Sequence, residues 1–585
     1  MVFSSRHERT AKPAKVRLLD LLRPYSGMVA LLVLLALLSN GVNLLLPRII
    51  SRAIDSFTKG NFVLKTVVFE FSIAALIIFV FTYLQTIVQT FASERVARDL
   101  RRQLSEKISY QSNAYIQGAN PSRLLTNLTS DVDSIKLFVS QAIVSIVSSL
   151  FIIIGASILL LIINWKLALA VLTIIPIIGG TFYTILGKVR VLFKKSRETI
   201  DWLNKVLNES ILGSAIIRVL NSQQLEYDKF MAANTDAKNL GLSIIKLFAA
   251  LIPVITFTAN MALLIILALG GHFVITGKMS LGDFAAFNSY LSLLIFPIIL
   301  IGFMSSVIAQ ASASYTRISI VLGTPENEET GTVTRDLKGA IELLGVRVSY
   351  AEKPVLKDIS FKIGAGTKTA VIGPTAAGKT QLLHLLTALI KPDAGKIEFD
   401  GMGIDNYKKE SFHSQVGFVF QDSIIFNLSL RENIAFSDKV SDKSLEKAIV
   451  TAELREFIDS LPNKLDTVVS ERGASLSGGQ KQRIMLARAL AINPKILLLD
   501  DFTARVDNRT EKKILENIDQ NYPGITLLSV TQKISSIEHY TEIILLMEGE
   551  IIAKGKHKDL MQTCPEYVQI YNSQRSTGHY ELQSE

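Results

Sequence analysis

The sequence predicts two successive folds in one chain, an α-helical membrane domain followed by an α/β domain. Of its 585 residues, 49% are hydrophobic and only 19% are charged, and the mean hydropathy is +0.34. Six apolar segments are long enough to cross a bilayer, which takes roughly 20 residues each. From about residue 341 the pattern changes to alternating strands and helices, which is typical of α/β domains.

The six apolar segments define the predicted membrane domain. We place them near residues 27–48, 63–91, 136–163, 166–187, 248–274 and 280–310. The links after the second and fourth segments are long and polar with helical periodicity, so we expect cytoplasmic extensions of the membrane helices there. The other links are short and are expected outside. Residues 17–25 place four leucines beside Arg17 and Arg23, which predicts an amphipathic helix at the inner membrane face.

The distribution of charge predicts the orientation in the membrane. The net charge is +10, and the basic residues cluster in three stretches, 6–17, 95–107 and 188–197. This is the positive-inside pattern, so we expect a cytoplasmic N-terminus and no nucleic-acid partner. Arg48, Arg52 and Lys59 oppose the pattern in the first outer link, but the inner stretches outweigh them. The single cysteine, Cys564, excludes a framework of intramolecular disulfides.

Formal charge is scarce inside the predicted spans, and Glu70 is the acidic residue that we single out there. A carboxylate within a membrane segment is a functional candidate by default. Glu70 lies about two helical turns from the outer end of its segment, so a side chain that reaches the membrane surface is the alternative. A few Asn and Gln side chains in the other spans suit a cavity for amphiphilic cargo or, equally, contacts between helices.

The change in composition after the last apolar segment divides the chain. Residues 323–331 are polar and rich in turn formers, which is typical of a linker. We therefore predict a membrane domain over 1–322, a linker over 323–340, an α/β domain over 341–573 and a polar tail over 574–585.

A phosphate-binding loop is the first motif of the α/β domain. Residues 373–380 fit the pattern G-x-x-x-x-G-K-[ST], between a predicted strand and a predicted helix. Backbone N–H groups at a helix N-terminus bind anions, so we expect the loop to hold nucleotide phosphates. We assign Lys379 to the β- and γ-phosphates and the Thr380 hydroxyl to Mg²⁺. The loop consists of Gly373, Pro374, Thr375, Ala376, Ala377, Gly378, Lys379 and Thr380, and Gln381 follows it.

A second glycine motif precedes another predicted helix. It consists of Ser477, Gly478, Gly479 and Gln480. The two glycines leave room for a ligand to approach the backbone closely, and the helix points its N-terminus at negative charge.

An acidic strand end is the third motif. The apolar run 496–499 ends in Asp500, and Asp501 comes next. This predicts a buried strand that brings the Asp500 carboxylate to Mg²⁺ beside a nucleotide.

Together the three motifs resemble the ATP-binding cassette (ABC) family, in which they occur in this order and spacing. The resemblance covers essentially the whole chain. It is to an exporter-type half-transporter, with one six-helix membrane domain (the type I or type IV ABC exporter fold) fused to one α/β P-loop nucleotide-binding domain. It implies an ABC transporter ATPase in the cytoplasmic membrane, with ATP and Mg²⁺ as cofactors.

The resemblance also implies roles for further residues. Tyr350 is similar to the aromatic residue that stacks on adenine, and Gln421 is similar to the glutamine that senses Mg²⁺ and contacts the membrane domain. Asp507 lies in the segment that crosses the dimer interface. Three segments resemble parts that connect the domains: residues 467–473, which contain Glu471 and Arg472, and the coupling-helix regions at 120–133 and 213–220.

Two positions depart from the family pattern. Asp501 stands where the family has a Glu that polarises the attacking water, and Gln532 stands where it usually has His. In both respects the chain resembles the degenerate subunit of bacterial heterodimeric multidrug exporters. This implies a second half-transporter as partner, which carries the missing Glu and His. Smaller departures are Ala376 for Gly, Gln381 for Ser or Thr, and an unusual Arg505.

Several functions follow from this resemblance. We expect ATP-driven export of drug-like or lipidic molecules, with a weak ATP site on this chain's P-loop. The second glycine motif, Ser477 to Gln480, resembles the ABC signature motif, which contacts the γ-phosphate of an ATP held by the opposite subunit, so we expect it to complete the partner's competent site. Lipid flipping or import by the same fold is one alternative. A non-hydrolytic regulatory subunit is another. A soluble ATPase that pairs with separate permeases is excluded by the fused membrane segments.

Overall fold

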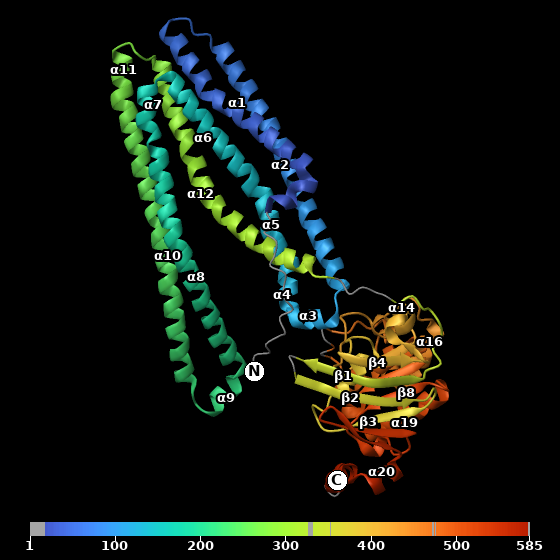
Figure 1. The fold of residues 1–585 in the computed structure, drawn as a ribbon. Helices are drawn as coiled ribbons and strands as arrows, with labels where there is room; N and C mark the ends of the chain where they lie inside the picture. Colours follow the sequence, from blue (N-terminus) through green and yellow to red (C-terminus); the bar gives the residue numbers. More distant parts are fainter. Residues whose placement is uncertain (1–17, 326–330, 351–352, 471–472, 474, 583–585) are drawn as a thin grey trace. The chain divides into compact units, whose positions relative to one another are not determined.

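A computed structural model describes residues 18–325, 331–350, 353–470, 473 and 475–582 (Figure 1). The chain divides into two compact units. Among the described residues, one unit runs to Ser109 and continues over Pro121–Thr324, and the other holds Tyr110–Asn120 and the chain from Pro325 onward. Each unit is described by itself.

The first unit contains six helices that are long and apolar enough to span a membrane, which confirms the predicted number. They cover Asp20–Thr58, Leu64–Ser109, Pro121–Ile163, Trp165–Leu212, Gln223–Ile275 and Leu281–Gly323. Their elements are η1 (Leu18–Tyr25), α1 (Ser26–Thr58), α2 (Leu64–Ser109), α4 (Pro121–Thr126), η2 (Asn127–Asp131), α5 (Val132–Leu137), η3 (Phe138–Ala142), α6 (Ile143–Ile163), α7 (Trp165–Leu172), α8 (Ile174–Leu212), α9 (Ser214–Val219), α10 (Gln223–Ile265), η4 (Ile266–Gly270), α11 (Gly271–Ile275) and α12 (Leu281–Gly323).

Within this unit, α1 packs against α2, α6 and α12, and α8 lies beside α10 (Figure 1). Polar contacts fix one end of α1 to the start of α12. The Asp55 carboxylate accepts hydrogen bonds from the Ser280 hydroxyl and the Gly282 N–H, both at 2.8 Å, and Arg48 forms an ion pair with Asp283 at 3.2 Å. Because carboxylates favour helix N-termini, these contacts stabilise the first turn of α12.

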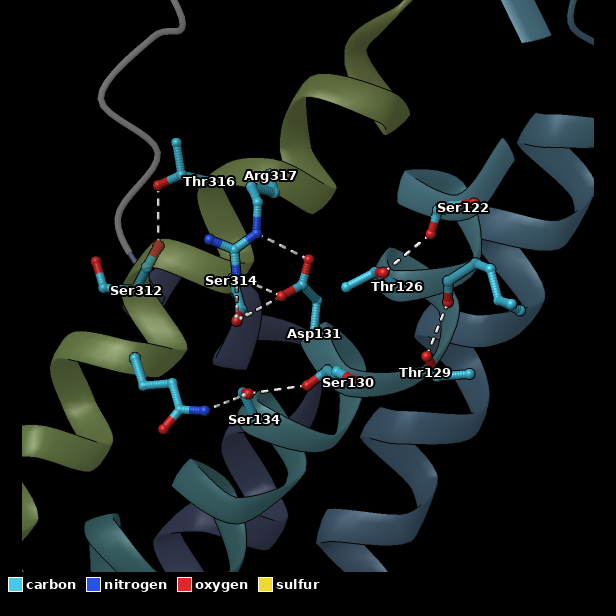
Figure 2. Close-up of polar contacts among 12 residues, drawn as sticks. Ser122, Thr126, Thr129, Ser130, Asp131, Ser134, Ser312, Ser314, Thr316 and Arg317 are labelled. Carbon is cyan, nitrogen blue, oxygen red and sulfur yellow. Dashed lines mark hydrogen bonds and ion pairs between the residues drawn. The ribbon is translucent and has the colours of Figure 1, made fainter. Parts of the chain in front are cut away.

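A buried ion pair joins the third and sixth membrane helices (Figure 2). Arg317 of α12 donates from Nε to Asp131 Oδ2 at 2.9 Å and from Nη2 to Asp131 Oδ1. The Ser314 hydroxyl donates to Asp131 Oδ1 at 2.9 Å. Asp131 ends the π-helix η2 and is only 2% exposed, so its charge depends on these donors. The sequence analysis did not single out this pair.

The first segment that resembles a coupling-helix region, 120–133, does not form a separate short helix. The separate short helix is α3 (Asn113–Ala119), which Ser112 caps by accepting from the N–H of Tyr115. The predicted region, 120–133, instead begins the third membrane helix. Asn120 takes a left-handed φ of 62° and ends α3, and Pro121 starts the next helix, where a missing N–H costs nothing. The second predicted region, 213–220, coincides with α9.

The second unit carries two sheets. The order in one is β2-β1-β4-β5, with antiparallel neighbours, and the order in the other is β10-β9-β3-β8-β7-β6, in which only β10 is antiparallel. The strands are β1 (Ile341–Tyr350), β2 (Lys353–Ile363), β3 (Lys368–Ile372), β4 (Ala394–Phe399), β5 (Met402–Gly403), β6 (Val416–Val419), β7 (Ile496–Asp500), β8 (Thr526–Val530), β9 (Glu542–Met547) and β10 (Glu550–Gly555).

Helices cover the parallel sheet, and one apolar cluster lies on each of its faces. Strand β7 is buried along its whole length, as expected for a parallel strand that is covered on both sides. The helices are α13 (Lys379–Leu386), α14 (Lys409–His413), α15 (Leu430–Ala435), α16 (Asp442–Thr451), α17 (Arg455–Asp459), α18 (Gly478–Ala491), α19 (Asn508–Asn521), α20 (His557–Thr563) and α21 (Pro565–Leu582). Helix α21 differs from the predicted tail, because it continues beyond residue 573 to Leu582.

Candidate nucleotide-binding site

The phosphate loop joins β3 to α13, and its two outer glycines have no room for a side chain. Gly373 has a φ of +155°, and a Cβ there would lie 1.9 Å from the carbonyl oxygen of Leu546. Gly378 has a φ of +99°, and a Cβ there would lie 2.7 Å from Leu356 Cδ2. At Gly373 the neighbour is a backbone atom that cannot move far, and at Gly378 the positive φ adds to a second close contact, the Val355 carbonyl oxygen at 3.0 Å from that Cβ. Both positions therefore favour glycine. The loop therefore holds the shape that exposes its N–H groups to a phosphate.

Ala376 departs from the family pattern at a position where the backbone favours glycine. Its φ is +67°, a left-handed conformation that costs an alanine about 1–2 kcal/mol. The loop keeps this conformation nonetheless. Lys379 lies over it and donates from Nζ to the carbonyl oxygens of Gly373 and Pro374, both at 2.8 Å. These are weak acceptors that phosphate oxygens can replace.

The two acidic residues meet the loop at the carboxyl end of β7. Asp500 is 2% exposed, and the nearby Thr380 side chain acts to lower the pKa of its carboxyl group. Burial raises the pKa of Asp500 and of Asp501. Burial lowers the pKa of Lys379, while the charges of both aspartates oppose that shift. The structure therefore brings Lys379, Thr380, Asp500 and Asp501 together, as predicted from the motifs.

The donor set fits Mg²⁺ held together with a nucleotide rather than by protein alone. Among the described residues there is no group of three or more His, Cys, Asp or Glu side chains that could hold a metal. Mg²⁺ usually takes one or two protein ligands and completes its shell with phosphates and water. The Thr380 hydroxyl and the Asp500 carboxylate, which lie close enough for Thr380 to influence the pKa of Asp500, match that requirement.

Gln421 follows β6, and its side chain is exposed. Its carbonyl oxygen accepts a hydrogen bond from Gln482 Nε2 at 3.2 Å. Gln482 lies on α18 and is 2% exposed. The contact ties the Gln421 loop to the helix of the second glycine motif, and nothing in the sequence pattern pointed to Gln482.

Tyr350 and Gln381 contact each other. The Tyr350 hydroxyl donates to Gln381 Oε1 at 2.8 Å, which links the end of β1 to the first turn of α13. Tyr350 remains 46% exposed, so its ring is available for stacking on a base. Burial and the nearby Asp393 raise its pKa, which keeps the hydroxyl protonated as a donor.

The second glycine motif begins α18 and carries a capping box. The Ser477 hydroxyl accepts from the N–H of Gln480 at 3.2 Å, and Gln480 Oε1 accepts from the N–H of Ser477 at 2.8 Å. This arrangement satisfies two otherwise unpaired donors at the helix start. The glycines pack against Arg505: a Cβ at Gly478 would lie 3.2 Å from Arg505 Cδ, and one at Gly479 would lie 2.9 Å from its carbonyl oxygen. The unusual Arg505 thus supports the motif.

Asp501 and Gln532 stand at the ends of neighbouring parallel strands, β7 and β8. Asp501 takes a left-handed φ of 49° and donates its N–H to the Val530 carbonyl at 2.9 Å. Gln532 is exposed, and its carbonyl accepts a hydrogen bond from Gln574 of α21. Gln574 also accepts from the N–H of Ile534 at 3.0 Å. Gln574 therefore holds the loop on both sides, in a region that was expected to begin a polar tail.

Lys533 is a further residue that sequence reasoning missed. Its ammonium group donates to the Thr503 carbonyl and to Asn508 Oδ1, both at 3.2 Å, and it pairs with the buried Glu511 at 3.4 Å. It thereby joins the loop after β8 to the start of α19. Asp507 caps that helix by accepting from the N–H of Thr510 at 2.9 Å, which lowers the pKa of Asp507.

The predicted interface contacts involve either a second chain or residues that the structure does not describe. A contact of Asp507 across a dimer stays a prediction. Glu471 and Arg472, in the segment predicted to touch the coupling helices, lie outside the described residues.

Two family models match this chain, the ABC transporter transmembrane region over residues 29–298 and the ABC transporter over residues 356–504. The chain is also 31% identical over 565 residues to an uncharacterized ABC transporter ATP-binding protein, YfiB, of Bacillus subtilis (strain 168), with 95% of this chain and 98% of the relative covered. The chain belongs to the ABC transporter family. It is an exporter half-transporter, a multi-pass membrane protein whose ATPase domain drives transport.

Two other proteins are similar over nearly the full length of this exporter subunit. It is 30% identical over 568 residues to the ATP-dependent lipid A-core flippase of Syntrophus aciditrophicus (strain SB), with 95% of this chain and 94% of the relative covered. A solved bacterial Atm1-family ABC exporter with ATP bound superposes with a TM-score of 0.78 at 24% identity, with 94% of this chain and 99% of that chain covered. The structural likeness confirms the exporter fold.

Proposed function

We propose that this exporter subunit works in a heterodimer, in which its own phosphate loop forms a weak ATP site. Its signature motif, Ser477 to Gln480, completes the competent site of a second half-transporter. ATP binds here with Mg²⁺, which Thr380, Asp500 and Gln421 help to hold. The observation that carries the proposal is Asp501, a short carboxylate at the position that must reach the attacking water.

With Asp instead of Glu at position 501, the carboxylate extends less far from the backbone. The backbone of Asp501 is fixed by the hydrogen bond to Val530 and by burial of β7, so the shorter side chain cannot be offset by a shift of the strand. An Asp carboxylate stops about 1.5 Å short of a Glu carboxylate, the length of one C–C bond. Burial raises the pKa of Asp501, so the group keeps its basicity. Phosphoryl transfer depends on positioning, so hydrolysis suffers more than binding.

We propose drug-like or lipidic amphiphiles as the cargo. The six apolar helices support this, because they offer few charges to a polar cargo. The similarity to a lipid A-core flippase supports a lipidic one.

Two substitutions test the weak site. The purified chain alone should bind ATP–Mg²⁺ and hydrolyse it far more slowly than about 1 per second, the low end of usual turnover. Asp501→Glu combined with Gln532→His should raise the rate by about 10²-fold or more, as expected for a restored general base. Adding Lys379→Ala to this double variant should remove the increase in hydrolysis rate, which would show that the added hydrolysis takes place at this phosphate loop. Turnover of several per second by the unaltered chain would contradict the proposal.

We also propose that the N-terminus and the nucleotide-binding domain are cytoplasmic, in the cytoplasmic membrane. The basic stretches along α2 and α8 support this orientation. In a Cys564→Ala background, a cysteine at Asn61 or Gly277 should react with an impermeant thiol reagent from outside. A cysteine at Ser112 or Thr235 should not react, and the reverse pattern would overturn the orientation.

A further inference from the structure

A cavity of about 430 Å³ opens between α1 and α2, on the stretches Val42–Arg52 and Phe69–Ile77. Seven of its ten lining residues are apolar, and the other three are Arg48, Arg52 and Glu70. We call it the α1–α2 cavity. An apolar wall with both signs of charge fits neither a purely hydrophobic ligand nor a free ion, so its composition calls for an amphiphile.

Two of the three charges in the α1–α2 cavity are available to a ligand. Arg48 is already paired with Asp283 at 3.2 Å. Among the described residues, neither Arg52 nor Glu70 forms an ion pair or a side-chain hydrogen bond, and both are exposed. An unpaired charge within a membrane segment is costly and marks a functional site. A ligand that carries one negative and one positive group would satisfy both.

The two available charges lie at the same depth. Arg52 comes six residues before the end of α1 at Thr58, and Glu70 comes six residues after the start of α2 at Leu64. At 1.5 Å per residue, each lies about 9 Å from its helix end. In a bilayer whose surface lies at these helix ends, this depth corresponds to the boundary between headgroups and acyl chains, because the headgroup region adds about 5–7 Å on each side of the hydrocarbon core. The cavity extends away from the turn between the two helices as far as the apolar residues Val42 and Ile77.

We propose that the α1–α2 cavity binds a phospholipid whose headgroup carries a phosphate and a primary amine. Arg52 pairs with the phosphate, Glu70 accepts hydrogen bonds from the ammonium group, and the start of one acyl chain lies along the apolar wall. The volume suits a headgroup and the first part of one chain. This site goes beyond the proposed function, because the bound lipid need not be cargo and the site does not depend on ATP hydrolysis.

Lipid titrations of the purified full-length chain, followed by native mass spectrometry, test this site. The probes are dioleoyl phosphatidylethanolamine, phosphatidylglycerol, which lacks the amine, phosphatidylcholine, whose amine has no N–H, and inorganic phosphate. We expect the ethanolamine lipid to bind most tightly. Arg52→Gln should weaken the ethanolamine and glycerol lipids alike, by about fivefold to tenfold, the low end for a charged hydrogen bond at a partly exposed site. Glu70→Gln should weaken only the ethanolamine lipid and so remove its preference.

Lys65→Gln is the matched control, because it removes a charge from the same helix outside the cavity and should leave all affinities unchanged. An equal loss on Lys65→Gln would overturn the proposal. So would an ethanolamine preference that survives Glu70→Gln, or full competition by inorganic phosphate. If Arg52→Gln and Glu70→Gln weaken assembly with the partner chain and leave lipid binding intact, the cavity is a subunit interface and the proposal is wrong.

Discussion

Removing the guanidinium of Arg317 should destabilise the membrane domain far more than removing that of an exposed arginine. Arg317→Met keeps much of the apolar stem but takes two charged hydrogen bonds from Asp131, whose side chain is 3% exposed. Among the described residues, only the Ser314 hydroxyl then donates a side-chain hydrogen bond to that carboxylate. Losing one partner of a buried pair costs about 3–5 kcal/mol. Because the Arg317 side chain is itself 41% exposed, we expect the low end, about 3 kcal/mol.

The partner substitution should cost less, which makes a double-mutant cycle informative. Asp131→Asn keeps the shape of the side chain and leaves a guanidinium that can reach water, so we expect about 1.5 kcal/mol. The double variant should lose about 2.5 kcal/mol, since no buried charge is left without a partner. The coupling energy is then about 2 kcal/mol, within the usual range for residues in contact.

The matched control is Arg101→Met. Arg101 pairs with Asp133 at 2.6 Å in the same part of the bundle, but the two side chains are 44% and 59% exposed. Exposed pairs contribute about 0–1 kcal/mol. Both tryptophans, Trp165 and Trp202, lie in the membrane domain, so their fluorescence during unfolding in mixed micelles reports on this domain. Equal losses for Arg317→Met and Arg101→Met would show that burial of Asp131 does not set the energy.

The remaining predictions concern the nucleotide site. In the assembled heterodimer, Gly478→Asp places a charge at the partner's competent site and should nearly abolish ATP hydrolysis. Lys379→Ala should slow transport and leave measurable ATP turnover. ATPase assays of both variants test this, and the opposite result would reverse the assignment of the two sites. Because the pKa of Asp500 is raised, its proton should compete with Mg²⁺ at a higher pH than for an ordinary Asp, so Mg²⁺–ATP affinity should fall as the pH falls. A raised pKa in the folded state means that the folded protein binds this proton more tightly than the unfolded chain does, so this carboxyl group stabilises the fold more at low pH. As the pH falls, Mg²⁺–ATP affinity should therefore decrease while the contribution of Asp500 to the free energy of unfolding increases.

Local patterns were enough to predict the six membrane helices and the strand, loop and helix around the phosphate motif. The six membrane helices follow from runs of apolar residues, and the strand before Gly373 follows from a short apolar run that ends in a glycine motif. The charged residues that meet at the site, Lys379 and Asp500, each belong to a motif whose spacing is fixed by a strand and a turn. The residues of this site could therefore be identified from motifs that are local in the sequence.

Pairings between distant elements could not be predicted in the same way. Asp131 lies in the third membrane helix and Arg317 in the sixth, with two membrane helices between them in the sequence. Each residue alone has the pattern of an ordinary charge near the end of an apolar segment. Lys533 and Glu511 are similar, because their contact depends on how the loop after β8 meets α19. The helix boundary inside the predicted segment 120–133 has a local cause instead. Asn120, with its positive φ, and the helix-starting Pro121 mark that boundary, and the signal was present in the sequence.

The two departures from the family pattern lie on a scaffold that is otherwise complete. Asp501 and Gln532 occupy the ends of adjacent strands whose backbones are hydrogen-bonded to each other. The loop that carries Gln532 is held by Gln574 on one side and by the contacts of Lys533 on the other. If the site had lost its activity through a loss of local stability, we would expect these side-chain hydrogen bonds to be missing. Besides the smaller departures at Ala376, Gln381 and Arg505, the reach of one carboxylate and the basicity of one side chain differ, and we propose that the site is kept for binding ATP while its chemistry is slowed.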